Sequence, residues 1–358
     1  MCNFGVGEPD FITPQHIRDA AKAALDAGET KYGPPPGLPR LRALVAQKLQ
    51  RENHLPYTIE QVMVSVGGKQ ALFNVLMAIV GAGDEVLIPV PYWVTYPEIV
   101  KIAGGVPVFL PTTEATEYKV TPEQLEAAIT TKTRALVLNS PSNPTGAVYS
   151  RKALVGLAEV LVARNVAVVS DEIYEKLIYD DAQHVSIGSL GEDIFNLTIT
   201  CNGLSKAYAA TGWRLGYAAG PEHVIKAATT LQSHVTSCAN TFAQHGAIAA
   251  LEGPQDPIEA MRRVFEQRRD LLYARLCDID GLESPRPQGA FYIFPNISKT
   301  GLDSMTFCQR LLEQERVALV PGIAFGADAN VRISYATDLE TIEKGVNGLA
   351  HFVNMLRG

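Results

Sequence analysis

A lysine and an arginine eight residues apart carry the first chemical signal in the sequence. Lys206 follows the apolar run 198–201, and Arg214 ends the segment 211–214, TGWR. A lysine amine can condense with an aldehyde, and an arginine can hold a phosphate through two hydrogen bonds. Each residue alone is more often an ordinary surface residue. Together they indicate a cofactor that carries both an aldehyde and a phosphate.

A carboxylate and two other polar side chains follow further apolar runs. Asp171 comes directly after the run 166–169 and Ser170, Tyr174 stands three residues later, and Asn143 lies in the segment 139–146, NSPSNPTG. A half-buried carboxylate needs a cationic partner, and a protonated pyridine nitrogen is one. Tyr174 and Asn143 can then hydrogen-bond a phenolic oxygen on the same ring. The alternative is that Asp171 only caps a turn and that the proline-rich segment is only a turn.

A pair of glycines joins a predicted strand over 62–66 to a predicted helix over 69–79, in the segment GGKQ at 67–70. Glycines let the backbone approach an anion, and a helix N-terminus attracts one. Lys69 is unfavourable at a helix start unless an anion lies beside it. The strand-end segments therefore offer an amine, a pyridinium partner, a phenolic-oxygen partner and a phosphate cradle. This set is far more specific than any of its members.

A sheet must position these residues, because short β-branched runs alternate with helical patterns through the middle of the chain. The predicted strands span 62–66, 85–88, 106–110, 135–138, 166–169, 198–201 and 215–219. Between two of them, Thr121 is a candidate N-cap with Pro122 at the first helical position. The alternation predicts an α/β fold with a mostly parallel seven-stranded sheet and helices on both faces. Ligands of such sheets collect at the carboxyl ends of the strands.

The pattern changes after about residue 254. A long charged helix is expected over 258–277, followed by strands near 291–294, 317–320 and 331–335 and helices over 304–314 and 339–352. We therefore predict a large cofactor-binding domain over 15–257. A smaller α+β domain would comprise 1–14 and 258–358.

Composition excludes several classes of protein. The 358 residues are 47% hydrophobic and 19% charged, which suits a folded core and excludes wholesale disorder. The net charge of −7 makes nucleic acid and anionic membranes poor partners. No apolar run approaches the length of a bilayer span, and no secretory signal is visible, so we expect no membrane segment.

Cysteine and histidine usage give two further expectations. The five cysteines lie far apart without a C-x-x-C motif, which predicts a reduced, cytoplasmic protein. The seven histidines are scattered, and none has the spacing of a metal-binding pair. We therefore expect no metal site.

At this point the chain resembles the class I pyridoxal-phosphate-dependent aminotransferases, and among them the aspartate aminotransferases of the bacterial, thermophile-like subgroup. The resemblance covers nearly the whole chain and implies the fold type I of pyridoxal-phosphate-dependent transferases. It also implies pyridoxal 5′-phosphate as cofactor, amino acids and 2-oxo acids as substrates, and a homodimer with shared active sites. The matching motifs are GVGEPDF at 5–11, KYGP at 31–34, GGKQ at 67–70, PYW at 91–93, NPTG at 143–146, DEIY at 171–174, SK at 205–206, TGWR at 211–214 and VRISY at 331–335.

The resemblance implies a catalytic or cofactor-binding role for each matching residue. Lys206 would form the internal aldimine and then act as the general base. Asp171 would pair with the pyridine nitrogen, Tyr174 and Asn143 would hydrogen-bond the phenolic oxygen, and Trp93 would stack on the ring.

The phosphate and the substrate would be bound by other matching residues. Arg214 and the amides of Gly68 and Lys69 would hold the phosphate, and Tyr32 would reach the phosphate of the partner subunit. Relatives often carry a hydroxyl where this chain has Gly203, and Ser205 would partly replace that contact. Arg332 would hold the substrate α-carboxylate by a paired hydrogen bond, with the N–H of Gly7 beside it and with Asn143 and Trp93 against the substrate.

Substrate choice depends on Lys69, because a dicarboxylate brings a second anion that needs a cation. We expect transfer of the amino group from aspartate to 2-oxoglutarate by a ping-pong mechanism, giving oxaloacetate and glutamate. Prephenate and aromatic or neutral amino acids are alternative substrates, and Lys69 would then only support the phosphate. Other possibilities are a C–S lyase or decarboxylase with the same cofactor and a catalytically silent sensor. A nicotinamide dehydrogenase would need the G-x-G-x-x-G motif, which the chain lacks.

Overall fold

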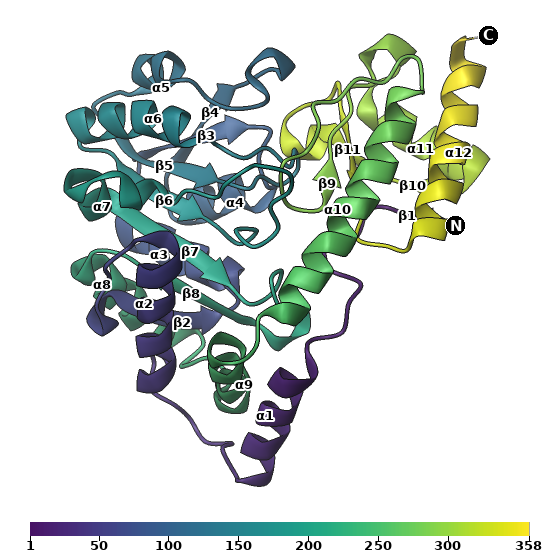
Figure 1. The fold of residues 1–358 in the computed structure, drawn as a ribbon. Helices are drawn as coiled ribbons and strands as arrows, with labels where there is room; N and C mark the ends of the chain where they lie inside the picture. Colours follow the sequence, from purple (N-terminus) through teal and green to yellow (C-terminus); the bar gives the residue numbers. More distant parts are fainter. Residues whose placement is uncertain (358) are drawn as a thin grey trace.

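The computed structural model describes residues 1–357, and its centre is one seven-stranded sheet (Figure 1). The strand order is β2-β8-β7-β6-β5-β3-β4, and within this sheet only β8 runs antiparallel to its neighbours. The sheet strands are β2 (Val62–Val66), β3 (Glu85–Val90), β4 (Val106–Pro111), β5 (Thr133–Asn139), β6 (Ala167–Asp171), β7 (Thr198–Gly203) and β8 (Leu215–Ala219). Each predicted strand of the middle region overlaps one of these, so the predicted α/β fold is confirmed.

Helices cover both faces of the sheet, because strands buried on both sides need apolar cover on both sides. Side chains of even and odd positions along the strands enter separate cores: Met63 packs with α3, α4 and α8, whereas Val62 and Val64 pack with α1, α2 and α9. Helices α5, α6 and α7 complete the second face over β3 to β6. These helices are α1 (Gln15–Asp26), α2 (Pro39–Asn53), α3 (Gly68–Ile79), α4 (Thr95–Ile102), α5 (Pro122–Ala128), α6 (Arg151–Arg164), α7 (Glu192–Leu197), α8 (Glu222–Val235) and α9 (Thr241–Glu252).

Local sequence signals set the helix boundaries around the sheet. Thr121 caps α5 as predicted, since its hydroxyl accepts from the backbone N–H of Gln124 and Pro122 is the first helical residue. Ser150 caps α6 in the same way, and Asn165 ends that helix in a left-handed conformation. The sequence reasoning named no helix at α1, α2, α7, α8 or α9.

The C-terminal part begins with the long helix α10 (Asp256–Cys277), which runs away from the sheet (Figure 1). Two small sheets follow, β1-β10 and β11-β12-β9, with α11 and α12 packed beside them. The predicted strand 317–320 is in fact two strands in different sheets, because the backbone changes partner at Leu319. The elements are β1 (Cys2–Asn3), β9 (Tyr292–Ile293), β10 (Val317–Ala318), β11 (Val320–Pro321), β12 (Val331–Ser334), α11 (Ser304–Glu315) and α12 (Leu339–Arg357).

The N-terminal strand lies with the C-terminal part. β1 pairs in parallel with β10, and Phe4 packs in the same core as Phe307 and Phe352. The division into domains of 15–257 and of 1–14 with 258–358 stays a prediction. No helix in the described part of the chain is both long and apolar enough to cross a membrane.

Candidate active site

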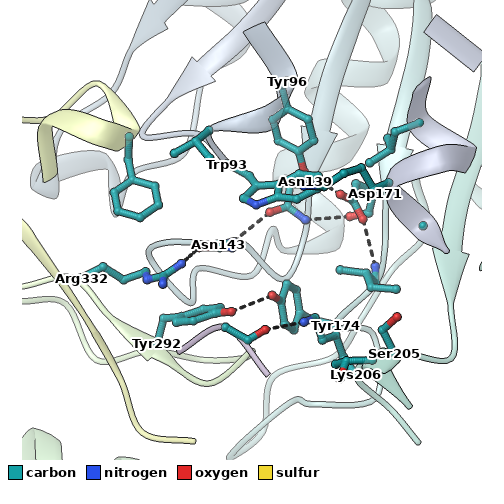
Figure 2. A pocket seen from close by; sticks show the side chains of 18 of the residues that line it. Trp93, Tyr96, Asn139, Asn143, Asp171, Tyr174, Ser205, Lys206, Tyr292 and Arg332 are labelled. Atoms are coloured by element: carbon teal, nitrogen blue, oxygen red, sulfur yellow. Dashed lines mark hydrogen bonds between the residues drawn. The ribbon is translucent and has the colours of Figure 1, made fainter. Parts of the chain in front are cut away.

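A cavity of about 560 Å³ lies at the carboxyl edge of the large sheet, where the C-terminal part meets it (Figure 2). Its size falls in the range of about 300–1,000 Å³ that is typical of small-molecule sites. The register aligns three strand ends here, because Asn139 pairs with Asp171 and Asp171 with Cys201. Of the residues predicted for the site, the cavity is lined by Gly7, Gly68, Lys69, Trp93, Asn143, Asp171, Tyr174, Ser205, Lys206, Arg214 and Arg332.

Asp171 ends β6 with its carboxylate buried at the floor of the cavity. Tyr96 of α4 donates to Asp171 Oδ2 at 2.7 Å, and the backbone N–H of Ile173 donates to Oδ1 at 3.2 Å. Burial raises the pKa of Asp171 to about 6, although the Tyr96 hydrogen bond opposes the rise. A carboxylate buried with only neutral donors favours a cationic partner in the cavity.

Lys206 enters the same cavity from the loop after β7. Its ammonium group donates to the backbone oxygen of Gly7. Burial lowers the pKa of Lys206 to about 8; the Glu8 carboxylate opposes this shift, whereas Arg214 and Arg332 add to it. About a tenth of the amine is therefore neutral at pH 7, and a neutral amine is the form that acts as nucleophile or base.

Arg332 reaches the cavity from β12 in the C-terminal part. Its Nη1 donates to Asn143 Oδ1 at 3.1 Å and its Nη2 to the backbone oxygen of Gly5 at 2.9 Å, while Nε has no partner. The guanidinium group is 4.5 Å from the ring centroid of Tyr292 and 5.1 Å from that of Phe325. No ion pair joins this buried cation to any described carboxylate, so it can receive a carboxylate from a ligand.

An anion cradle forms where β2, β8 and α3 meet. Gly67 has a φ of +83°, and a Cβ there would lie 2.5 Å from Arg214 Nη2. The strand β8 starts at Leu215 and runs opposite to its neighbours, so Arg214 stands at the same edge as their carboxyl ends. Gly68 at the N-terminus of α3 and Arg214 both line the cavity, and a helix N-terminus and a guanidinium group both attract an anion.

Lys69 and Trp93 form the outer wall of the cavity. Lys69 Nζ lies 4.9 Å from the Trp93 ring centroid, a cation–π arrangement at the start of α3. No ion pair joins Lys69 to a carboxylate of the described residues, so its charge is available to a ligand.

Tyr32 and Gly203, which the sequence analysis discussed for the phosphate site, do not line the cavity. Tyr32 is 91% exposed and lies outside the cavity, beside a surface hollow lined by residues 29–32 and 238–242. Gly203 is required by close packing, since a Cβ there would lie 2.8 Å from the backbone oxygen of Leu215. Ser205 is buried and lines the cavity.

The cavity residues that the sequence reasoning did not single out include Tyr96, Asn139, Tyr292 and Phe325. Asn139 was named only as part of a turn, although it ends β5 and donates to the backbone oxygen of Asp171 at 2.9 Å. Its place at a strand end was a usable signal. Tyr96, Tyr292 and Phe325 stand inside apolar patterns, which made them indistinguishable from core residues.

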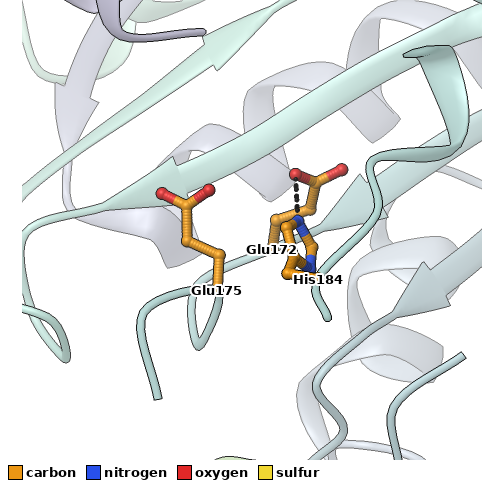
Figure 3. A group of neighbouring side chains, drawn as sticks. All are labelled: Glu172, Glu175 and His184. Carbon is orange, nitrogen blue, oxygen red and sulfur yellow. Dashed lines mark hydrogen bonds and ion pairs between the residues drawn. The ribbon is translucent and has the colours of Figure 1, made fainter. Parts of the chain in front are cut away.

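A second group of titratable side chains comes from the segment that follows Asp171 in the chain (Figure 3). Glu172, Glu175 and His184 have ligand atoms within 4.8 Å of one another, which is close enough for a metal ion. The ammonium group of Lys48 already binds Glu175, and His184 Nε2 is 2.9 Å from Glu172 Oε2. These cations compensate the two carboxylates, so we do not propose a metal there.

Comparison with known proteins identifies the family. The sequence profile described as "Aminotransferase class I and II" matches residues 1–349. The chain is 50% identical to the aspartate aminotransferase of Geobacillus stearothermophilus over 99% of this chain and 91% of that protein. It is 48% identical to the aspartate/prephenate aminotransferase of Cereibacter sphaeroides over 96% of this chain and 89% of that protein. The crystal structure of the aspartate aminotransferase from Rhizobium meliloti superimposes with a TM-score of 0.96 at 43% identity, covering 98% and 91% of the two chains.

The chain therefore belongs to the class I and II aminotransferases. This finding confirms the resemblance and the enzyme class that the motifs predicted. The roles of the individual cavity residues stay predictions.

Proposed function

We propose that this protein is a pyridoxal-phosphate-dependent aminotransferase that moves the amino group of aspartate to 2-oxoglutarate by a ping-pong mechanism. The observation that carries the proposal is the pairing of Asp171 and Lys206 in one cavity. Burial raises the pKa of the carboxyl to about 6 and lowers that of the amine to about 8. Opposite shifts of this kind are typical of a site that handles protons near neutral pH.

The cavity fits pyridoxal phosphate by the chemistry of its side chains. An amine that is partly neutral suits the aldehyde, a buried carboxylate suits the pyridine nitrogen, and the cradle at Gly67 and Arg214 suits the phosphate. When bound, the cofactor supplies an aldehyde for condensation with amines and an electron-accepting ring.

The residues of the chain would then hold the ring and move the protons. Lys206 Nζ would anchor the aldehyde end and afterwards remove the proton from the substrate α-carbon. Asp171 would keep a proton on the pyridine nitrogen, and Trp93 would cover the ring face. Tyr174 would donate to the phenolic oxygen; Asn143 has its Nδ2 available for the same task because Oδ1 already accepts from Arg332.

The phosphate would be held by Arg214, the backbone N–H groups of Gly68 and Lys69, and the hydroxyl of Ser205. A helix N-terminus and a guanidinium group together are a strong binding site for a dianion.

The substrate would be oriented by cations at both ends. Arg332 would bind the α-carboxylate beside the N–H of Gly7, and Lys69 would bind the side-chain carboxylate of aspartate. Asn143 and Trp93 would complete the contacts with the substrate. The names of the relatives support this preference, since several are aspartate aminotransferases.

Prephenate is the second candidate substrate, because some relatives are named aspartate/prephenate aminotransferases. Prephenate also carries two carboxylates, and the apolar side chains of Val320 and Phe325 line the cavity near Arg332. Prephenate is a 2-oxo acid and would replace 2-oxoglutarate as the amino acceptor, so the two acceptors are distinguished by comparing their rates with aspartate and the same purified enzyme.

We also propose a homodimer with shared active sites in the cytoplasm. Tyr32, at 91% exposure beside the surface hollow, is available to reach the phosphate of a partner subunit. The five cysteines are free thiols, which suits a reducing compartment. The contact of Tyr32 with the partner subunit is tested by comparing the sedimentation coefficients of Tyr32→Ala and of the unaltered protein.

The deciding experiment is the visible spectrum of the purified protein loaded with pyridoxal phosphate. We expect a yellow band that bleaches with aspartate and returns with 2-oxoglutarate. A band that does not change with aspartate but bleaches with neutral amino acids would refute the specificity role of Lys69. Absence of a band in the reconstituted protein would refute the prediction that pyridoxal phosphate is the cofactor.

A further inference from the structure

Tyr292 joins two parts of the cavity that the sequence places far apart. It lies on β9, next to β12, and its side chain is 1% exposed. Its ring lies under the guanidinium group of Arg332 at 4.5 Å, and its hydroxyl is 3.0 Å from that of Tyr174 (Figure 2). One side chain thus contacts both the carboxylate-binding arginine and the tyrosine beside the cofactor ring.

We propose that Tyr292 is a positioning residue with two separable functions, resting on the function proposed above. Its ring face holds Arg332 in the orientation that receives the substrate carboxylate. Its hydroxyl orients the proton of Tyr174 toward the cofactor.

The function of the ring follows from the surroundings of Arg332. The guanidinium group lies against two aromatic faces, those of Tyr292 and Phe325, and donates only to the neutral oxygens of Asn143 and Gly5. An aromatic face attracts a cation without competing for its hydrogen bonds. The ring therefore restrains the orientation of the Arg332 guanidinium group without occupying any of its N–H donors.

The function of the hydroxyl follows from the pairing of two buried phenols. Burial raises the pKa of Tyr174 well above its usual value and also raises that of Tyr292, so both are neutral donors. Each hydroxyl has the other as its hydrogen-bond partner among the described residues. If Tyr292 donates to Tyr174, then the Tyr174 proton points into the cavity, and the chain of two hydrogen bonds strengthens that donation.

Gly7 shows how closely this hydroxyl is surrounded. A Cβ at Gly7 would lie 3.2 Å from the Tyr292 hydroxyl oxygen, and the backbone oxygen of Gly7 accepts from Lys206. The Tyr292 hydroxyl thus lies close both to Tyr174 and to the backbone segment that accepts from Lys206.

The two functions are separated by two substitutions. Tyr292→Phe keeps the aromatic face and removes the hydroxyl, whereas Tyr292→Leu removes both. The control is Tyr335→Phe, because Tyr335 is also buried in the C-terminal core, donates to a backbone oxygen at 3.3 Å and lies outside the cavity.

Two measurements test the functions of the Tyr292 ring and hydroxyl. The first is the calorimetric dissociation constant of maleate, a dicarboxylate that cannot react. We expect Tyr292→Phe to bind maleate within about twofold of the unaltered enzyme and Tyr292→Leu to bind it roughly 3- to 30-fold more weakly. The second is the pH midpoint of the visible band of the loaded protein, which we expect to rise by about half a unit in Tyr292→Phe.

The outcomes distinguish this proposal from the proposed function. If the unaltered protein bleaches with aspartate but Tyr292→Phe has an unchanged pH midpoint, the hydroxyl has no positioning role. Equal maleate binding by Tyr292→Phe and Tyr292→Leu overturns the role of the ring. An unaltered protein without a visible band refutes the proposed function instead.

Discussion

Replacing Tyr96 with phenylalanine tests how the structure controls the charge of Asp171. The substitution removes one hydroxyl, which donates to Asp171 Oδ2 at 2.7 Å, and keeps the ring against Trp93. A hydrogen bond to a charged group contributes about 1.5–3 kcal/mol, which corresponds to roughly one to two pKa units. Because burial already raises the pKa of Asp171 to about 6, the variant should titrate at roughly 7–8.

The consequence is a pH-dependent loss of cofactor affinity. At pH 7 the carboxyl is about 90% ionised in the unaltered protein, but only about 10–50% in Tyr96→Phe. If ionised Asp171 is the partner of the pyridine nitrogen, the dissociation constant for pyridoxal phosphate should rise roughly two- to tenfold at pH 7. The difference should nearly vanish at pH 9, where both carboxyls are ionised.

The assay is equilibrium titration of the cofactor-free protein with pyridoxal phosphate at pH 6, 7, 8 and 9. Tyr57→Phe is the matched control. The Tyr57 hydroxyl is buried and donates to a backbone oxygen, but Tyr57 does not line the cavity. A ratio of dissociation constants between Tyr96→Phe and the unaltered protein that does not change with pH would refute the reasoning. It would mean that the Tyr96 hydroxyl does not control the ionisation of Asp171.

Three further predictions follow from the other charged groups. Lys206 has a pKa of about 8, so the rate of cofactor loading should rise about tenfold per pH unit below 8 and level off above it; a break near 10 in stopped-flow absorbance would contradict this. Lys69→Ala should lose roughly tenfold or more in kcat/KM for aspartate and little for phenylalanine, and equal losses in steady-state assays would remove its specificity role. Burial lowers the pKa of His184, but the Glu172 and Glu175 carboxylates outweigh it and hold the pKa above the usual value, so its stabilisation is complete below about pH 6.5 and is lost as pH rises through the raised pKa. His184→Gln should therefore lower the Tm more at pH 6 than at pH 9, and an equal loss at both pH values in thermal unfolding would show that His184 is not charged in the fold.

The location of the cavity at the carboxyl edge of the large sheet could be predicted from the sequence, because it depends on local patterns. Apolar β-branched runs mark strands, and the polar segments that follow them, which carry Asn143, Asp171 and Lys206, mark where the strands end. Parallel strands bring such ends to one edge by their geometry alone. The alternation of strands and helices likewise determined the α/β class, and Thr121 with Pro122 determined where α5 begins.

The partners of those residues were decided only by the tertiary structure. Tyr96 and Tyr292 belong to apolar patterns, and nothing local shows that their hydroxyls meet Asp171 and Tyr174. These contacts span 75 and 118 positions of the chain, so they exist only after separate elements have packed. Packing also sets burial, and burial is what shifts the pKa of Asp171 and of Lys206. The residue types thus determined which chemistry is available, whereas the environment that tunes it arose from contacts distant in sequence.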